Sequence, residues 1–157
     1  KDYTDFIWMT VSTGVGGAVV ESSKLVRGGY GFAGELGHLK VEYKKPAHCP
    51  CRQYGGLEAH GSGTALIRET RKRALDSPSF AKELEKMGLK ADGAGCAVLA
   101  RAGNQDELEI IDQIGTYLGR GISYCINILN TQAVIVGGGV AASLDLLLPS
   151  IRTSVCQ

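Results

Sequence analysis

The sequence predicts a mixed α/β fold in a single domain that spans residues 1–157. An apolar, β-branched run over Phe6–Val11 is typical of a buried strand. Apolar side chains recur at three- and four-residue spacing over Glu107–Leu129, which indicates one long amphipathic helix. A second apolar run, Ala133–Val136, leads into glycines and a closing helix. A chain of this length can bury one hydrophobic core, but not two of comfortable size.

The first third of the chain is predicted to form strands and loops. A polar turn at Glu21–Ser23 separates two short apolar runs, which is typical of a hairpin. Five glycines within residues 28–38 argue against regular structure in that stretch. After the first strand we expect, in order, a turn over 12–17, hairpin strands at 18–20 and 24–27, an irregular stretch over 28–38, a short strand at 39–43 and a loop over 44–56.

The rest of the chain is predicted to be helical up to the closing strand. Ser77-Pro78 favours a helix start, because serine caps a helix and proline fits its first turn. We expect helices over 57–75, 80–87, 95–102 and 107–129, then the strand 133–136 and a closing helix over 141–151. The order is a meander of strands, a run of helices, and a final strand–glycine–helix unit.

Composition and charge argue against several classes of protein. Seventeen basic against sixteen acidic residues give a formal net charge of +1, so we expect no direct nucleic-acid contact from this segment and no attraction to membranes. No apolar run approaches the ~20 residues that a membrane helix needs, and no signal peptide is visible. Cys96, Cys125 and Cys156 stand among apolar residues, as buried free thiols do. We therefore expect a cytoplasmic protein.

Glycine is the outlier, with 22 residues of 157, and two glycine-rich turns lie beside predicted strands. The first contains Thr13, Gly14 and Gly16, and the second is Gly137–Gly139. Glycine lets backbone N–H groups approach a phosphate or a nucleoside without obstruction by a Cβ atom. Neither turn fits the P-loop or the G-x-G-x-x-G dinucleotide pattern, and a tight turn without a ligand is the alternative. Two such turns in one domain suggest a nucleotide held between two surfaces.

Three polar residues form a second candidate site. Glu35 and His38 stand among glycines, where a long carboxylate has no packing role, and Glu58 opens the helix expected from residue 57. Ionised carboxylates accept hydrogen bonds from hydroxyl groups, which is how polyhydroxylated ligands are commonly held. The alternative is that Glu58 favours the helix dipole and that Glu35 is a solvated loop residue.

A third candidate is a metal site formed by His38, Cys49 and Cys51. Zinc prefers four nitrogen or sulfur ligands, and two cysteines on one loop readily supply a pair. The sequence offers these three clear candidates, with His48 and His60 nearby. The set therefore suggests zinc but is one ligand short.

Taken together, these motifs resemble those of the ROK family, which comprises repressors, open reading frames and sugar kinases. The resemblance extends over essentially the whole chain, in order. The family signature is matched by V-S-T-G-V-G-G-A-V at 11–19, followed by Gly28, Gly34 and Gly37-His38. The segment E-L-G-H at 35–38 resembles the sugar motif E-x-G-H, and C-P-C-R-Q-Y-G-G-L-E at 49–58 resembles the zinc and sugar segment C-x-C-G-x-x-G-C-x-E. The segment V-I-V-G-G-G-V at 134–140 resembles the adenosine motif.

The resemblance implies an actin-like ATPase (ribonuclease H-like) fold, of which this chain would be the C-terminal lobe, with the N-terminal lobe missing. It also implies ATP-dependent phosphorylation of a hexose with Mg²⁺, as in bacterial glucokinases, and a homodimer. Carried over position by position, it assigns the sugar hydroxyls to Glu35, His38 and Glu58, the ATP phosphates to Thr13, Gly14 and Gly16, the adenosine to Gly137, Gly138 and Gly139, and a structural zinc to His38, Cys49 and Cys51.

The chain departs from the family pattern in three ways. The phosphate motif D-x-G-x-T and the catalytic Asp are absent because both lie upstream, so no catalytic residue is assigned and the isolated chain is expected to be inactive. Gly56 replaces the third zinc cysteine, which leaves His48 or His60 as substitutes. Ser12 and Arg52 stand where glycine is frequent.

Three functions remain open at this stage. The first is a glucokinase-like sugar kinase, and the second is the sugar-sensing domain of a ROK-family transcriptional repressor, whose DNA-binding part would lie upstream. The third is a binding or structural lobe without catalysis. The glycines of both turns favour the kinase, because a sugar sensor needs the carboxylates but not a phosphate cradle.

Overall fold

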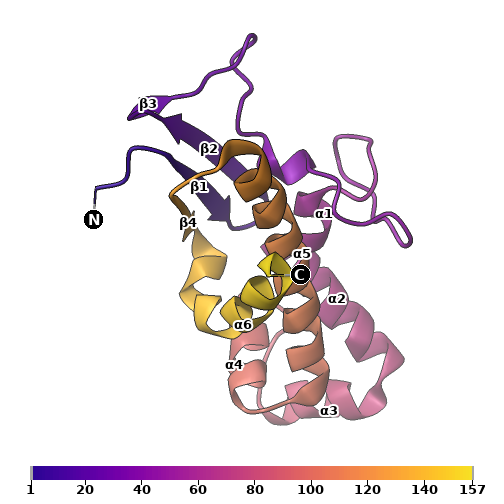
Figure 1. Ribbon diagram of the computed structural model, residues 1–157. Helices are drawn as coiled ribbons and strands as arrows, with labels where there is room; N and C mark the ends of the chain where they lie inside the picture. The colour runs from indigo at the N-terminus through magenta and orange to yellow at the C-terminus, as the bar shows by residue number, and fades with distance from the viewer. Residues whose placement is uncertain (1, 157) are drawn as a thin grey trace.

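The strands form where the apolar runs stand in the sequence. A computed structural model describes residues 2–156, and β1 (Phe6–Val11) is an inner strand of its sheet. β1 pairs in antiparallel fashion with β2 (Val15–Glu21) and in parallel with β4 (Ala133–Gly137), while β3 (Lys24–Leu25) extends the far side of β2. The strand order is therefore β3-β2-β1-β4 (Figure 1).

Alternation along β1 separates the two faces of the sheet, because successive side chains of a strand point in opposite directions. Ile7 and Met9 are completely buried, whereas Trp8 between them is 44% exposed. The buried residues share one hydrophobic core with α5 (Gln105–Leu129) and α6 (Leu144–Val155), the two helices that pack most extensively against each other. This core fixes the sheet relative to the helices (Figure 1).

The remaining α-helices follow β3 and precede β4 along the chain. They are α1 (Leu57–Gly61), α2 (Gly63–Asp76), α3 (Pro78–Lys86) and α4 (Gly93–Arg101), with two 3₁₀ turns, η1 (Leu36–His38) and η2 (Gly139–Ser143). The helices α2 to α5 each begin at a side chain that accepts a hydrogen bond from a backbone N–H of the first turn: Ser62, Ser77, Asp92 and Asn104. Such caps satisfy N–H groups that the helix itself leaves unpaired.

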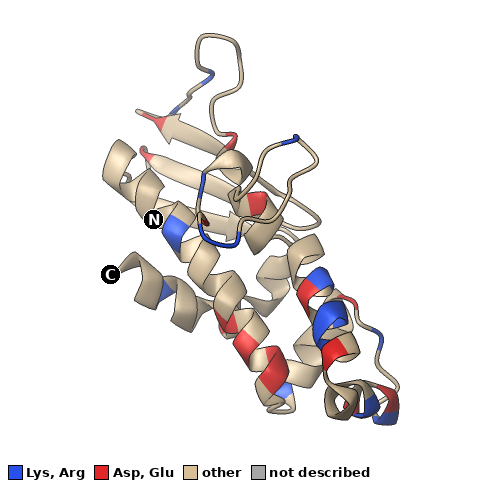
Figure 2. Cartoon of the chain, turned by 90° about the vertical axis from the view of Figure 1, so that its right-hand side faces the viewer, with Lys and Arg blue, Asp and Glu red and all other residues tan. Residues whose placement is uncertain are grey.

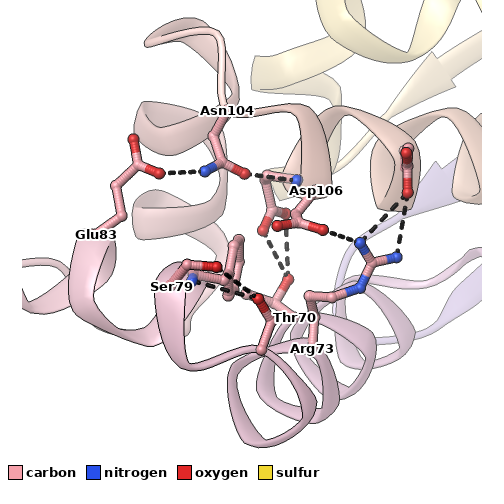
Figure 3. A network of polar contacts seen from close by, with 10 residues as sticks. Thr70, Arg73, Ser79, Glu83, Asn104 and Asp106 are labelled. Carbon is pink, nitrogen blue, oxygen red and sulfur yellow. Dashed lines mark hydrogen bonds and ion pairs between the residues drawn. The ribbon is translucent and has the colours of Figure 1, made fainter.

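A network of polar side chains ties α2, α3 and α5 together at the end of the molecule away from the sheet (Figure 3). Arg73 of α2 forms ion pairs with Asp106 and Glu109 of α5. Asn104, the cap of α5, donates a hydrogen bond of 2.5 Å to Glu83 of α3. These contacts hold three helices whose own hydrophobic core is small.

The structure confirms the first strand, the closing strand and the long helix, and it corrects the helix expected over 57–75. That helix is broken at Ser62, whose backbone is extended, with a φ of −84° and a ψ of 167°. The Ser62 hydroxyl oxygen accepts a hydrogen bond of 3.1 Å from the Ala65 N–H. Serine competes with the helix for its own backbone groups, which makes it a cap between two helices instead of a member of one.

Three further expectations are corrected. The short strand expected at 39–43 is wrong: only Lys40 forms an isolated bridge, to Gly56, because the partner segment passes directly into α1 at Leu57. The second strand begins at Val15, so Gly16 lies within β2 and not in the turn. The closing helix begins at Leu144, after η2. Within residues 2–156, no helix is both long and apolar enough to cross a membrane.

Candidate functional site

The two glycine-rich turns lie next to each other. β1 and β4 are parallel neighbours, so their carboxyl ends meet at the same edge of the sheet. Gly138 has a φ of +96° and packs against the carbonyl oxygen of Val11 with no room for a side chain, so glycine is required there. A Cβ atom on Gly139 would lie 3.6 Å from the Ser12 hydroxyl oxygen. Turns that are far apart in the sequence therefore form one surface.

The β1–β2 turn is also fixed against the start of α2. The Gly63 N–H donates a hydrogen bond of 2.7 Å to the Ser12 carbonyl oxygen, and the Thr64 hydroxyl donates one of 2.7 Å to the Thr13 carbonyl oxygen. The N-terminus of a helix carries partial positive charge. Thr13 and the adjacent Gly14 thus lie at a position that favours negative charge.

Two hollows flank this turn. One is mainly apolar, has a volume of about 140 Å³, and is lined by Ser12 and Gly139 together with residues of α4, α5 and α6. The other, of about 420 Å³, contains Glu58 and is lined by Thr13 and Gly14 on one side. Both linings are mainly apolar, but that of the first, which we call the apolar hollow, has no charged side chain among the described residues, whereas the second contains a carboxylate.

Glu58 connects the β1–β2 turn to the segment between β3 and α1. Its Oε2 atom accepts a hydrogen bond of 3.0 Å from the Val15 N–H, and the carboxylate fills the space that a side chain on Gly14 would need. Gly37 packs between the Val15 carbonyl oxygen and the Cβ atom of Glu58, again without room for a side chain. Glu58 is thus held in place by backbone groups on two sides.

Glu35 and His38 stand on either side of Gly37 in the sequence. The Glu35 Oε2 and His38 Nε2 atoms lie 3.8 Å apart, and the two side chains are 62% and 44% exposed. The Leu57 N–H donates a hydrogen bond of 2.8 Å to the Leu39 carbonyl oxygen, which joins this segment to the start of α1. The structure therefore places the three predicted sugar ligands on two paired segments.

The predicted metal ligands also lie together. The donor atoms of His38, Cys49 and Cys51 all lie within 4.8 Å of one another, and they form the one such group among residues 2–156. Burial is the main cause that raises the pKa of the Cys49 thiol, whereas the hydrogen bond with Cys49 lowers the pKa of Cys51. One nitrogen and two sulfur donors fit the preference of zinc and supply three of the usual four ligands.

Neither alternative ligand joins this group. His60 is buried, and its Nε2 atom accepts a hydrogen bond of 2.9 Å from the Ala47 N–H. His48 packs edge-on against Tyr54, with 5.1 Å between the ring centroids. Gly56 has no side chain to offer, so a bound zinc would need its fourth ligand from outside these residues.

Sequence reasoning missed several residues of the two hollows. Gly93 and Ala97 of α4 line the apolar hollow, and Thr64 and Arg68 of α2 line the one with Glu58. The helix pattern concealed them, because such side chains look like ordinary helix positions until the fold brings them to the turn. The Ser62-Gly63 break was the one local signal, since a cap there exposes the following N–H groups.

Comparison with known proteins gives a consistent picture. The family model described as "ROK family" matches residues 1–157. A glucokinase of Streptomyces coelicolor is 32% identical over 158 residues, which cover 98% of this chain and 50% of that protein. A xylose repressor of Bacillus spizizenii is 30% identical over 155 residues, which cover 99% of this chain and 36% of that protein. This chain thus spans half or less of the length of these curated relatives.

Solved structures agree with the sequence matches. The structure of a ROK family glucokinase from Streptomyces griseus in complex with glucose and AMPPNP superposes with a TM-score of 0.87. Its sequence is 31% identical, and the match covers 98% of this chain and 50% of that one. This likeness, together with that to a ROK hexokinase from Thermus thermophilus at a TM-score of 0.75, confirms the predicted actin-like ATPase fold.

Proposed function

Because this chain belongs to the ROK family, we propose that it is the C-terminal lobe of an ATP-dependent hexose kinase. The observation that carries the proposal is the position of the β1–β2 turn, which lies between an apolar hollow and a hollow that contains Glu58. A kinase must hold a nucleotide and a hydroxylated acceptor on the two sides of the transferred phosphoryl group. The transferred phosphoryl group would lie at the β1–β2 turn.

The sugar would be held by Glu35, His38 and Glu58. One carboxylate oxygen of Glu58 accepts the Val15 N–H, which leaves the other free for hydroxyl groups. Glu35 and His38 are exposed on the adjacent segment and can accept and donate further hydrogen bonds. Glu58 in its hollow, together with Glu35 and His38 on the adjacent segment, would orient a hexose so that one hydroxyl group points at the turn.

The nucleotide would lie along the paired turns. Adenosine would occupy the apolar hollow beside Gly137–Gly139, and the phosphates would face Thr13 and Gly14 at the start of α2. Gly16 would act from β2, where no atom lies within 4 Å of the space that a Cβ would fill. Mg²⁺ that binds with ATP would neutralise the developing charge. The general base is assigned to the other lobe, so these residues bind and orient.

The proposal also includes a structural zinc, a homodimer and a cytoplasmic location. His38, Cys49 and Cys51 would hold a structural zinc that links η1 to the loop after it. We also propose a cytoplasmic homodimer, which follows from the family resemblance.

A second function is supported by the likeness to the xylose repressor. The same lobe would then sense a sugar and control a DNA-binding part elsewhere in the protein. Nucleotide binding distinguishes the two functions, because a sugar sensor does not need it. Tight binding of AMPPNP by the chain joined to its upstream lobe supports the kinase, and sugar binding without AMPPNP binding supports the repressor.

The sugar site is tested with Glu58→Gln in this chain joined to its upstream lobe. Loss of the charge weakens the hydrogen bonds to hydroxyl groups, so we expect the dissociation constant for glucose to rise at least about tenfold, since charge-assisted bonds contribute ~1.5–3 kcal/mol. Isothermal titration calorimetry measures it, with the exposed Glu85→Gln of α3 as the matched control. Equal affinity in the wild type and Glu58→Gln would remove Glu58 from the site.

A further inference from the structure

A third hollow lies on the other side of α1 from Glu58. It has a volume of about 490 Å³ and is enclosed by the loop at 42–47, by α1 and α2, and by α5. Glu58 lines the hollow beside the β1–β2 turn, and His60, two residues later on α1, lines this one. The proposed sugar and nucleotide contacts do not use it. We call it the α1–α5 hollow.

The rim of the α1–α5 hollow carries uncompensated positive charge. Lys44 and Lys45 come from the loop, and Lys72 comes from α2 (Figure 2 shows basic residues in blue on both). Within residues 2–156, the ammonium groups of these three lysines form no ion pair or hydrogen bond. Arg68 also lines the hollow, but its guanidinium is already bound by Glu69 and by the Ala59 carbonyl oxygen.

The two carboxylates that line the hollow are already engaged. Glu69 lies 2.7 Å from the Arg68 guanidinium. Glu42 accepts hydrogen bonds from the backbone N–H groups of Lys44 and Lys45, at 2.6 and 3.1 Å, and pairs with Arg120 at 3.6 Å. The two N–H groups are the main cause that lowers the pKa of Glu42 to about 2. Glu42 is therefore a fixed anion that orders the loop at 42–47, which carries Lys44 and Lys45 and is called the lysine loop below.

His60 supplies a hydrogen-bond donor at the base of the hollow. It is 6% exposed, and its Nε2 atom accepts the Ala47 N–H, so a neutral ring carries its proton on Nδ1. Within residues 2–156, no fully buried side-chain nitrogen or oxygen lacks a partner, and no partner for this Nδ1 is found. The Nδ1 atom is therefore not fully enclosed by protein, and because His60 lines the hollow, its Nδ1–H is available as a donor there. Burial lowers the pKa of His60, which keeps the ring neutral and Nδ1 a donor at neutral pH.

We propose that the α1–α5 hollow is a second ligand site, which binds a small phosphomonoester or phosphate anion. A phosphate group carries close to two negative charges at neutral pH and several acceptor oxygens, which match three free ammonium groups and one neutral N–H donor. The volume suits a small metabolite rather than a macromolecule. Because the ligand would bridge the lysine loop, α1 and α2, it would also hold the far side of the helix that carries Glu58.

Histidine NMR can locate the anion directly, because the chain has three histidines and each lies in a different environment. His60 lines the α1–α5 hollow, His48 lines the hollow beside Glu58, and His38 belongs to the metal group. On addition of inorganic phosphate, we expect a saturable shift of the His60 ring resonances without one of His48. A shift confined to His48, or no saturable shift of His60, overturns the proposal.

A parallel titration with glucose 6-phosphate separates the two sources of the ligand. Tighter binding than inorganic phosphate at His60 identifies a phosphomonoester that contacts more of the hollow. Equal binding identifies the phosphate group alone. Either result supports the site, and neither depends on whether Glu58 binds sugar.

Two charge-removing variants test which groups bind the anion. Lys72→Gln and Lys45→Gln should each raise the dissociation constant for phosphate about fivefold or more, since both residues are exposed and their replacement leaves the fold intact. Lys86→Gln, exposed on α3, removes the same charge away from the hollow and should leave the constant unchanged. An equal loss in all three variants would mean that only overall charge matters, and it would overturn the proposal.

Discussion

Two regions of the molecule use polar residues in opposite ways. In the segment from Glu35 to Glu58, the charged side chains are exposed or partly exposed, and tight backbone packing at glycine holds them in place. Around the start of α5, polar side chains satisfy one another (Figure 3). Glu107 there is completely buried and accepts a hydrogen bond from the Thr70 hydroxyl. The first arrangement leaves hydrogen-bonding capacity for a ligand. The second uses that capacity to hold helices together.

The pKa values follow the same division. Burial is the main cause that raises the pKa of Glu107 to about 7 and that of Cys96 to about 12. Glu42, on the exposed loop, has its pKa lowered to about 2 by backbone N–H groups. Charge is therefore stabilised where the chain can meet ligands and penalised inside the helical region. Changes in the two regions should produce different kinds of defect.

The largest expected effect comes from Gly37→Ala in the loop region. The added methyl group would overlap the Val15 carbonyl oxygen and approach the Cβ atom of Glu58 to 3.2 Å, so the backbone must move. We expect a loss of about 2–3 kcal/mol in the free energy of unfolding, as for other overpacked sites. Urea denaturation measures the loss, and glucose binding should weaken with it.

Gly29→Ala is the matched control for that change. Gly29 lies in the same glycine-rich stretch, but no atom lies within 4 Å of the space that its Cβ would occupy. Its replacement should leave both stability and glucose binding close to the wild-type values. If the two variants behave alike, close packing at Gly37 does not hold the site.

A more local effect, confined to the metal group, is expected from Gly56→Cys. This variant places a thiol at the position where the resemblance expects the fourth zinc ligand, and its Cβ would lie 3.1 Å from the Gly37 carbonyl oxygen, a contact that needs only a small shift. A third thiolate, which completes a set of four ligands, should tighten zinc binding on the order of 100-fold. Competition with a chromogenic chelator measures the affinity, and cobalt substitution shows the number of thiolates by absorbance. Unchanged affinity would mean that position 56 does not face the metal.

The parts of the fold that follow a strong local pattern could be predicted from the sequence. The apolar alternation of β1 and the spacing over Glu107–Leu129 each reflect burial on one face, which is a property of nearby residues. The short strand at 39–43 could not be predicted correctly, because its apparent alternation comes from packing on loops and not from a continuous partner strand. Strand pairing is decided by residues far along the chain.

The same distinction applies to the site. Glu35, His38 and Glu58 could be found because a carboxylate among glycines, or at a helix start, is unusual in the sequence itself. Gly93 and Ala97 could not, because their position beside Ser12 depends on how α4 packs against α5 and α6. A hollow formed by separate helices leaves no local pattern, and the α1–α5 hollow was missed for the same reason.

The smallest expected effect comes from Glu107→Gln in the helical region. The buried Glu107 faces Thr70 and Cys96 and is near Arg73, and its pKa of about 7 lies above the ordinary value of 4.5. The folded state therefore binds a proton more tightly than the unfolded state. The stability that Glu107 contributes is complete below about pH 4.5 and is lost as the pH rises towards 7. Glutamine resembles the protonated acid at every pH.

We therefore expect Glu107→Gln to match the wild type near pH 4.5 and to be more stable by about 1–2 kcal/mol at pH 6, because the variant buries no charge. Urea denaturation across this pH range measures the difference, and Glu85→Gln, at an exposed position of α3, should show no such divergence. Glucose affinity should stay unchanged in Glu107→Gln, in contrast to Gly37→Ala. If the wild type and Glu107→Gln respond to pH in parallel, Arg73 and the hydrogen bond to Thr70 keep Glu107 ionised despite its burial.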